Sequence, residues 1–159
     1  MTANPKPGGS PSRRSMIAAT GAGACAALAA WFAPLRASAT PEQAQKLIAS
    51  FGPAAPKDGK ITLGAPEIAE NGATVPITIA VESPMTEQDY VTSILLVADG
   101  NPLPGVARFE LTPANGVAKV EIRIRLAQTQ TITAVAAMSD GSLWKASKTV
   151  KVTIGGCGG

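Results

Sequence analysis

The sequence contains no histidine and little cysteine, and both scarcities limit the chemistry that the chain can perform. Its 159 residues include no His and two Cys. Without histidine, the chain can form neither a Cys–His dyad nor a Ser–His–Asp triad. After residue 39, Cys157, Met85 and Met138 are the only soft metal ligands, which are too few for a zinc or copper site. The composition therefore argues against a self-contained hydrolase or metalloenzyme, and we expect no cofactor.

The sequence also lacks a long, strongly apolar run. The stretch from Met16 to Pro34 is rich in glycine and alanine, whereas a spanning helix needs about 20 strongly apolar residues. Arg13-Arg14 precedes this stretch and Ala37-Ser38-Ala39 follows it, in the order typical of a twin-arginine export signal. We therefore predict that residues 1–39 are a cleaved signal and that the mature protein is periplasmic. A membrane anchor and a lipid anchor at Cys25 are the alternatives.

Removal of residues 1–39 changes the charge of the chain. Four of the 14 basic residues lie in this segment, so ten remain against all 11 acidic residues, and the formal charge falls to about −1. The basic balance of the whole chain thus belongs to the signal, and nothing in the mature part indicates a nucleic-acid surface. The mature length suits one domain, which we place at residues 40–154.

Hydrophobic periodicity predicts one short helix followed by strands. Residues 41–50 have a helical apolar spacing, with Thr40 as cap and Pro41 at the first helical position. From Ile61 onward the period changes to two, most clearly in the alternating aliphatic and charged residues of 120–126. The predicted strands beyond Ile61 cover residues 75–81, 91–98, 107–111, 120–126, 130–138 and 144–154.

Residues 52–60 are predicted as a loop, and turn signals at residues 70–72, 99–102, 113–116 and 139–142 separate the strands. Asp140-Gly141 indicates a hairpin between the last two strands. Pro76 cannot donate to a ladder, which favours an edge position for its strand or a strand that begins there. Six or seven short strands in about 100 residues predict an all-β fold, an immunoglobulin-like antiparallel β-sandwich. A small barrel is the alternative. The acidic residues Glu67, Glu70, Glu87 and Asp89 have no spacing that requires a catalytic pair, and we interpret them as solvated.

The sequence ends in Gly155-Gly156-Cys157-Gly158-Gly159, directly after the last predicted strand. Glycine has no Cβ and wide backbone freedom, so residues 155–159 are predicted to form a flexible arm that carries one thiol. Cys157 is the only cysteine after residue 39, so it has no internal disulfide partner. A thiol on an arm suits a group carrier better than an active site. An interaction module that uses Cys157 for an intermolecular disulfide remains open.

The chain resembles the SoxY family, the sulfur-carrier subunits of the bacterial thiosulfate-oxidising Sox system. The resemblance depends on the motif 155–159, on the preceding strand 150–154 and on the export signal. Segments 66–72, 123–127 and 138–141 are also similar. The resemblance implies that Cys157 is the covalent attachment site for sulfur intermediates.

The resemblance also implies partners. A c-type cytochrome joins thiosulfate oxidatively to the cysteine, and a dimanganese hydrolase releases sulfate. In some organisms a molybdenum–haem sulfane dehydrogenase oxidises the remaining sulfur. The carrier pairs with a cysteine-free SoxZ-like subunit, which is exported folded with it. On this interpretation the chain is a carrier and not an enzyme.

Overall fold

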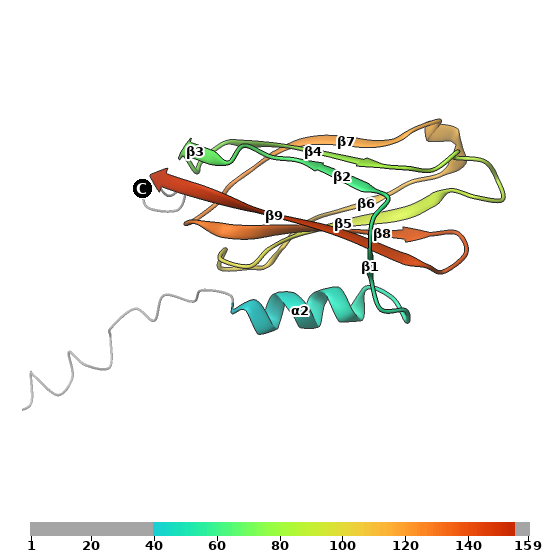
Figure 1. Ribbon diagram of the computed structural model, residues 1–159, viewed down its shortest axis with the longest axis horizontal. Helices are drawn as coiled ribbons and strands as arrows, with labels where there is room; N and C mark the ends of the chain where they lie inside the picture. Colours follow the sequence, from blue (N-terminus) through green and yellow to red (C-terminus); the bar gives the residue numbers. More distant parts are fainter. Residues whose placement is uncertain (1–39, 155–159) are drawn as a thin grey trace, which may run out of the picture. The chain divides into compact units, whose positions relative to one another are not determined.

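The computed structural model describes residues 40–154, which form two sheets packed face to face with one helix outside them (Figure 1). The predicted signal and the predicted arm lie outside the described residues. Within residues 40–154, no helix has the length and apolar character needed to cross a membrane. The elements are α2 (Pro41–Ser50), β1 (Lys57–Asp58), β2 (Ile61–Gly64), β3 (Ile68–Asn71), β4 (Val75–Val81), β5 (Val91–Ala98), β6 (Gly105–Glu110), the 3₁₀ helix η2 (Pro113–Asn115), β7 (Ala118–Ile124), β8 (Gln130–Met138) and β9 (Leu143–Ile154). The predicted all-β sandwich with a short N-terminal helix is confirmed.

Helix α2 has the bounds that the sequence predicted, because its first turn is capped by local side chains. Thr40 is the N-cap in an extended conformation, Pro41 follows, and the Thr40 N–H donates to Gln43 Oε1 at 3.2 Å. A hydrogen bond from the Thr40 side chain lowers the pKa of Glu42. A carboxylate in the first turn also faces the positive end of the helix dipole.

The helix covers part of the outer face of the larger sheet (Figure 1). Ala44 is the buried residue of the helix, and it packs with Leu95, Val97 and Val135. Leu47, Ile48 and Phe51 border this cluster. The small Ala44 side chain allows the helix backbone to approach the sheet closely. Leu47, Ile48 and Phe51 are larger, and they pack around the edge of this contact.

The larger sheet has the strand order β1-β9-β8-β5-β6, and its long ladders are antiparallel. Strands β8 and β9 form the predicted hairpin, in which Gly141 has a φ of 81°. That value lies in the left-handed region, which glycine adopts without the cost that a Cβ would add. The hairpin sets the register that brings Gln130 opposite Val150.

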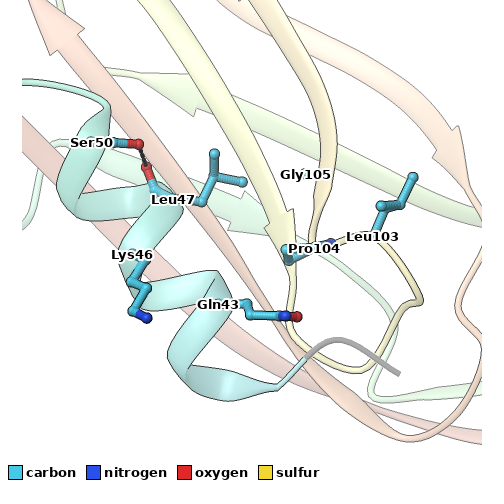
Figure 2. Close-up of a pocket in the computed structure, with 7 residues that line it drawn as sticks. All are labelled: Gln43, Lys46, Leu47, Ser50, Leu103, Pro104 and Gly105. Carbon is cyan, nitrogen blue, oxygen red and sulfur yellow. Dashed lines mark hydrogen bonds between the residues drawn. The ribbon is translucent and has the colours of Figure 1, made fainter. Parts of the chain in front are cut away.

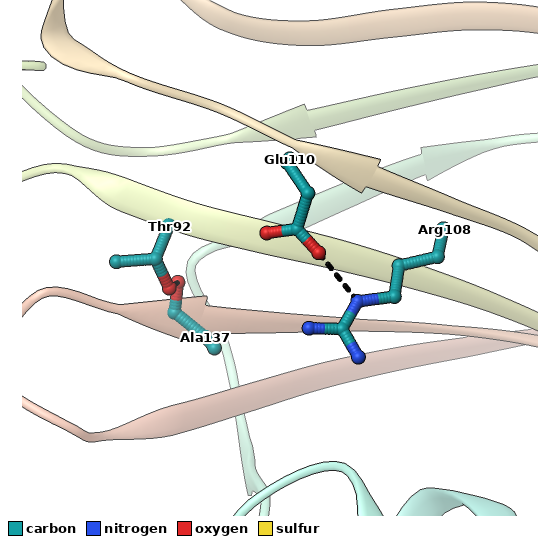
Figure 3. A network of polar contacts seen from close by, with 4 residues as sticks. All are labelled: Thr92, Arg108, Glu110 and Ala137. Carbon is teal, nitrogen blue, oxygen red and sulfur yellow. Dashed lines mark hydrogen bonds and ion pairs between the residues drawn. The ribbon is translucent and has the colours of Figure 1, made fainter.

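Two polar contacts lie on strands β5, β6 and β8 of the larger sheet (Figure 3). Thr92 donates its hydroxyl to the Ala137 carbonyl at 3.0 Å, and Arg108 Nε lies 2.6 Å from Glu110 Oε1. Both charged side chains are exposed, so solvent screens their attraction and the pair adds little stability. Charges on the edge strand β6 also discourage pairing with another chain.

The smaller sheet has the order β2-β4-β7. Strand β7 alternates as the sequence predicted: Lys119, Glu121 and Arg123 are exposed, and the residues between them face inward. Strand β4 is central, so an edge position for Pro76 is wrong, whereas the alternative prediction, a strand that begins near Pro76, agrees with its start at Val75. The ladder with β2 reaches only Thr78, two residues after Pro76, so proline has no ladder partner on that side.

One aliphatic core lies between the two sheets. Each large aliphatic side chain that is fully removed from water contributes about 1.5–3 kcal/mol. In this core the largest fully buried side chains are Ile77, Ile79, Ile94, Leu96, Leu126, Ile132, Val75, Val91 and Val150, whereas Val97 and Val135 are equally buried but lie under α2. The core positions alternate along the strands, which explains why the period-two pattern located them.

Strands β1 and β3 were absent from the sequence prediction, and both pair with β9 in parallel. Residues 57–58 lie in a segment predicted as a loop, and Glu70-Asn71-Gly72 was predicted as a turn. Both strands are short and carry mostly exposed residues, so they have no hydrophobic periodicity to detect. They form because β9 is long enough to offer each of them a free edge.

Candidate functional site: the base of the arm

The predicted site residues Gly155, Gly156, Cys157, Gly158 and Gly159 lie outside the described residues. The structure describes the strand that leads to them, β9, as far as Ile154. The candidate site is therefore the base of the arm: the last four residues of β9 and the elements that hold them. Its geometry determines where the thiol-bearing segment begins.

The end of β9 extends past its partner in the main sheet. Pairing with β8 stops at Gln130 opposite Val150. From Lys151 to Ile154, the strand next to β9 within the described part of the chain is β3, with Ala69 opposite Val152. Ala69 is buried and Val152 half-buried, so this pair attaches the extension to the core. Without β3, four residues of β9 would project from the sheet.

Three hydrogen bonds fix this extension from both sides. On one side, the Val152 N–H donates to Thr129 Oγ1 at 3.0 Å. On the other side, the Thr153 hydroxyl donates to the Glu70 carbonyl at 2.8 Å, and the Gly72 N–H donates to the Ile154 carbonyl at 2.7 Å. The last described residue, Ile154, is therefore held in place by a backbone hydrogen bond from Gly72.

The segment that precedes β3 is also tied to β9. Lys148 lies on the inner face of the strand, opposite Ile132, and its Nζ donates to the Ala65 carbonyl at 2.6 Å. The Lys151 N–H donates to the Glu67 carbonyl at 2.9 Å. A half-buried lysine can keep its aliphatic stem inside the fold while its ammonium group reaches a polar acceptor, here the Ala65 carbonyl. These contacts position β3 as a clamp for the arm.

A buried amide organises the loops beside the arm. Gln130 is 5% exposed, and its Nε2 donates to Asn101 Oδ1 at 3.0 Å and to the Gln128 carbonyl at 3.1 Å. Its Oε1 accepts from the Gly100 N–H at 2.8 Å. A Cβ at Gly100 would lie 2.9 Å from Gln130 Cβ, so only glycine permits this approach. All of these hydrogen bonds of the Gln130 side chain go to two loops, the one that contains Gly100 and Asn101 and the one that contains Gln128.

Asn101 extends the same network to the loop after β7. Its Nδ2 donates to the Arg125 carbonyl at 2.8 Å, and its Oδ1 accepts from the Ala127 N–H at 3.0 Å. The sequence predicted a turn at residues 99–102 but not this role. Asn101 and Gln130 are 29 residues apart, and no local pattern reports such a contact.

The described part of the chain offers little for catalysis. No group of three or more His, Cys, Asp or Glu side chains within residues 40–154 could hold a metal ion. The four acidic residues considered from the sequence are exposed and do not converge: Glu67 and Glu70 lie beside the end of β9, whereas Glu87 and Asp89 lie in the β4–β5 loop at the opposite end of the sandwich.

An open cavity of about 630 Å³ lies between α2 and the loop that precedes β6 (Figure 2). Lys46 is its one ionisable side chain, and the groove is otherwise neutral and largely apolar. Its lining residues are Gln43, Lys46, Leu47, Ser50, Leu103, Pro104 and Gly105. The Ser50 hydroxyl donates to the Leu47 carbonyl at 2.8 Å, and no acidic side chain lines the groove beside Lys46, so the lining has no paired acid and base for catalysis.

Two kinds of solved structure illustrate the likeness of this fold to known proteins. The sulfur carrier protein SoxY from Chlorobium limicola f thiosulfatophilum is 34% identical, with a TM-score of 0.60 over 72% of this chain and 100% of that one. A superoxide reductase (neelaredoxin) from Ignicoccus hospitalis is 20% identical, with a TM-score of 0.52 over 72% and 94% of the two chains. The second likeness shows the shared fold alone.

The comparison with curated protein sequences gives no match. The family model for the sulfur oxidation protein SoxY matches residues 45–157, which is more than half of the chain and includes Cys157. This match and the SoxY structure agree with the resemblance seen in the sequence, and the chain belongs to the SoxY family, the sulfur carriers of sulfur oxidation.

Proposed function

We propose that this protein carries the intermediates of thiosulfate oxidation covalently on Cys157 and presents them to separate enzymes. The observation that supports this most directly is the extent of the family match, which runs through residue 157. Cys157 is also the only cysteine after residue 39. The strand that leads to this thiol is clamped as far as Ile154, which suits a carrier whose arm has a fixed base.

Loading of the carrier is an oxidation. The Cys157 thiol and thiosulfate form one S–S bond, giving Cys–S–S–SO₃⁻ and releasing one proton and two electrons. The electrons pass to the c-type cytochrome partner, because this chain has no redox group of its own within the described residues. A thiol is mostly protonated at neutral pH, so the partner must also favour the thiolate.

Unloading is a hydrolysis. Water attacks the terminal sulfonate sulfur and the bond between that sulfur and the sulfane sulfur breaks, which gives sulfate, two protons and the persulfide Cys–S–S⁻. The dimanganese hydrolase supplies the activated water. A sulfane dehydrogenase, where one is present, oxidises the persulfide that remains.

The protein works in the periplasm as one half of a pair. The segment 1–39 has the features of a twin-arginine signal, and that route exports folded proteins. A SoxZ-like subunit without a signal of its own would therefore cross the membrane bound to this chain. The mature carrier then meets its enzymes as a heterodimer, away from the membrane.

Intact mass spectrometry of the exported protein tests the proposal. After growth on thiosulfate, we expect the mass of a chain that starts at Thr40. We also expect additions that a reductant removes on the peptide of residues 152–159. Cys157→Ser should remove every addition and stop thiosulfate consumption through this pathway. Cys25→Ser is the matched control and should change neither, because Cys25 is lost with the signal.

Two results would count against this function. A Cys157→Ser strain that consumes thiosulfate at the normal rate would exclude a carrier role for this thiol. A stable disulfide from Cys157 to another protein, with no sulfur or thiosulfonate addition, would favour an interaction module instead.

A further inference from the structure

We propose that the mature N-terminus has its own binding site on the folded body: the α-ammonium group that signal removal creates at Thr40 pairs with the Asp99 carboxylate. The inference depends on the proposed export, with cleavage after Ala39, and adds to it a role for the new chain end. It is supported by a cavity that Pro41 and Asp99 share, by a carboxylate without a cation partner in residues 40–154, and by the dipole of helix α2.

A cavity of about 350 Å³ lies among the first turn of α2, the β5–β6 loop and the start of β8. Pro41, which directly follows Thr40, lines it from the helix, and Asp99 lines it from the loop. On the other side of the helix, Gln43 and Pro104 of the same loop line the groove in Figure 2. A chain that starts at Thr40 therefore starts beside the Asp99 cavity. The remaining lining residues of this cavity are neutral: Gly100, Gln128, Thr129, Gln130, Thr131 and Thr149.

Asp99 is half-buried, and one of its carboxylate oxygens is already fixed. Its Oδ1 accepts from the Thr131 N–H at 2.9 Å, and its backbone N–H donates to the Thr131 carbonyl at 3.2 Å. Neither of the two ion pairs within residues 40–154 includes Asp99. A half-buried carboxylate attracts a cation more strongly than an exposed one, because less solvent screens its charge. The second oxygen of Asp99 is therefore suited to an ammonium group.

Signal removal changes the nitrogen of Thr40 from an amide to an ammonium. In the full chain the Thr40 N–H donates to Gln43 Oε1 at 3.2 Å. The Thr40 carbonyl accepts from the Gln43 N–H at 2.9 Å and from the Ala44 N–H at 3.2 Å, which keeps the residue on the helix. A positive charge at the start of a helix is opposed by the helix dipole. The new ammonium is no longer restrained by a preceding residue, so it can turn toward Asp99, whose charge offsets that repulsion.

Three other charged residues lie on the elements next to this cavity, and all three are exposed. Glu42 accepts a hydrogen bond from the Thr40 side chain, so it is the competing partner for the ammonium. Lys151 on β9 and Arg125 in the loop after β7 are the cations that can compete for Asp99. Solvent strongly screens the charges of exposed pairs, so the half-buried Asp99 is the favoured partner of the new N-terminus.

The pKa of the Thr40 amino group tests the ion pair. The exported complex with its partner subunit is labelled with ¹³C, and the Thr40 signals are followed by NMR from about pH 6 to about pH 10. An α-amino group ordinarily has a pKa of about 7.7–8.0. The helix dipole alone lowers this value, whereas a paired carboxylate raises it. We expect a wild-type value of at least about 7.7, and a lower value would overturn the ion pair even if no variant could be purified.

Two variants identify the partner of the ammonium. Asp99→Asn removes the charge but keeps an oxygen that can accept from Thr131, and it should lower the amino pKa by about 0.5–1 unit. Glu42→Gln is the matched control, because it removes an exposed carboxylate next to the same amine, and it should lower the pKa by less than about 0.3 unit. Equal pKa values in the wild type and Asp99→Asn would overturn the ion pair, as would a larger shift in Glu42→Gln than in Asp99→Asn.

The ion pair also predicts how stability depends on pH. A group whose pKa is raised in the folded state stabilises the fold below its unfolded pKa, and this contribution is lost as pH rises through the folded value. At about pH 6.5 the wild type should therefore unfold about 2–4 °C above Asp99→Asn. The difference should shrink by about pH 10, where the amine is neutral. A difference that is the same at both pH values would overturn the ion pair, because Asp99 would then act through Thr131 alone.

The mass of the exported chain separates this inference from the carrier function. If the chain does not start at Thr40, the ion pair fails, whereas additions on Cys157 would still support the carrier. If the chain starts at Thr40 and the amino pKa does not respond to Asp99→Asn, only the ion pair is wrong.

Discussion

The two ends of the sandwich are both held by side-chain hydrogen bonds to backbone, yet they differ in burial. At the arm end, the buried Gln130 amide and Asn101 connect two loops that are far apart in sequence. At the opposite end, exposed Ser139 bonds the backbone of Gln88 and Tyr90, and exposed Thr86 bonds Asp89. A buried amide costs far more to leave unpaired than an exposed hydroxyl does, so the arm end has one enforced arrangement.

Removal of the Gln130 amide should give the largest effect on stability. Gln130→Ala leaves the Gly100 N–H without its acceptor in a buried site and opens a cavity, so we expect a loss of about 2–3 kcal/mol in the free energy of unfolding. Urea unfolding of the mature chain measures this. The matched change at the opposite end is Gln88→Ala, where the side chain is exposed, and it should stay within about 0.5 kcal/mol. Equal losses at both ends would remove the contrast.

The clamp on β9 should respond more locally. Thr129→Val keeps the shape of the side chain but removes the acceptor for the Val152 N–H. We expect the amide hydrogen of Val152 to exchange about threefold to tenfold faster, since the lost hydrogen bond is worth about 1 kcal/mol. Native-state hydrogen exchange of the mature chain measures it.

Thr131→Val is the control for the clamp, because the Thr131 hydroxyl contacts Thr149 and not the end of β9. It should leave the Val152 amide unchanged. If both variants accelerate exchange at Val152 equally, the effect belongs to β8 as a whole and Thr129 has no special role at the base of the arm.

The smallest effect should come from pH at the opposite end. Hydrogen bonds from the Ser142 side chain and backbone N–H lower the pKa of Asp140 below its ordinary value of 3.8. A carboxylate with a lowered pKa in the folded state stabilises the fold above its unfolded pKa, and this contribution is lost as pH falls through the folded value. The stability of the hairpin should therefore decline slightly below about pH 4.

Asp140→Asn isolates this contribution, because the amide oxygen can still accept from Ser142 while the charge is gone. The difference in unfolding free energy between wild type and variant should be present at pH 6 and should shrink toward pH 2. A difference that stays constant over this range would mean that the charge of Asp140 plays no part. The Gln130 and Asn101 contacts use neutral amides, so this substitution should not alter them.

Local patterns identified most of the fold. The bounds of α2, β4, β5 and β8 agree with the sequence prediction. Each of these segments has a regular spacing of apolar residues and is flanked by capping or turn residues. The motif at residues 155–159 located the candidate site and the family without any structure. The pattern missed β1 and β3, which are too short and too polar to have a period. It allowed an edge strand or a strand start for Pro76, and it could not choose between them, because the residue at which the β2 ladder stops is set by tertiary pairing.

Periodicity and turn residues were therefore enough to specify a β-sandwich, since these features depend only on neighbours along the chain, whereas the thiol-bearing arm after Ile154 stays a prediction. The clamp on that arm is different. Thr129 and Val152 are 23 residues apart, and Thr153 and Glu70 are 83 apart, so their hydrogen bonds exist only after the core has aligned β9 with β3. The position and exposure of Leu103 in the β5–β6 loop likewise follow from long-range packing, because a loop residue acquires its neighbours only when distant strands meet.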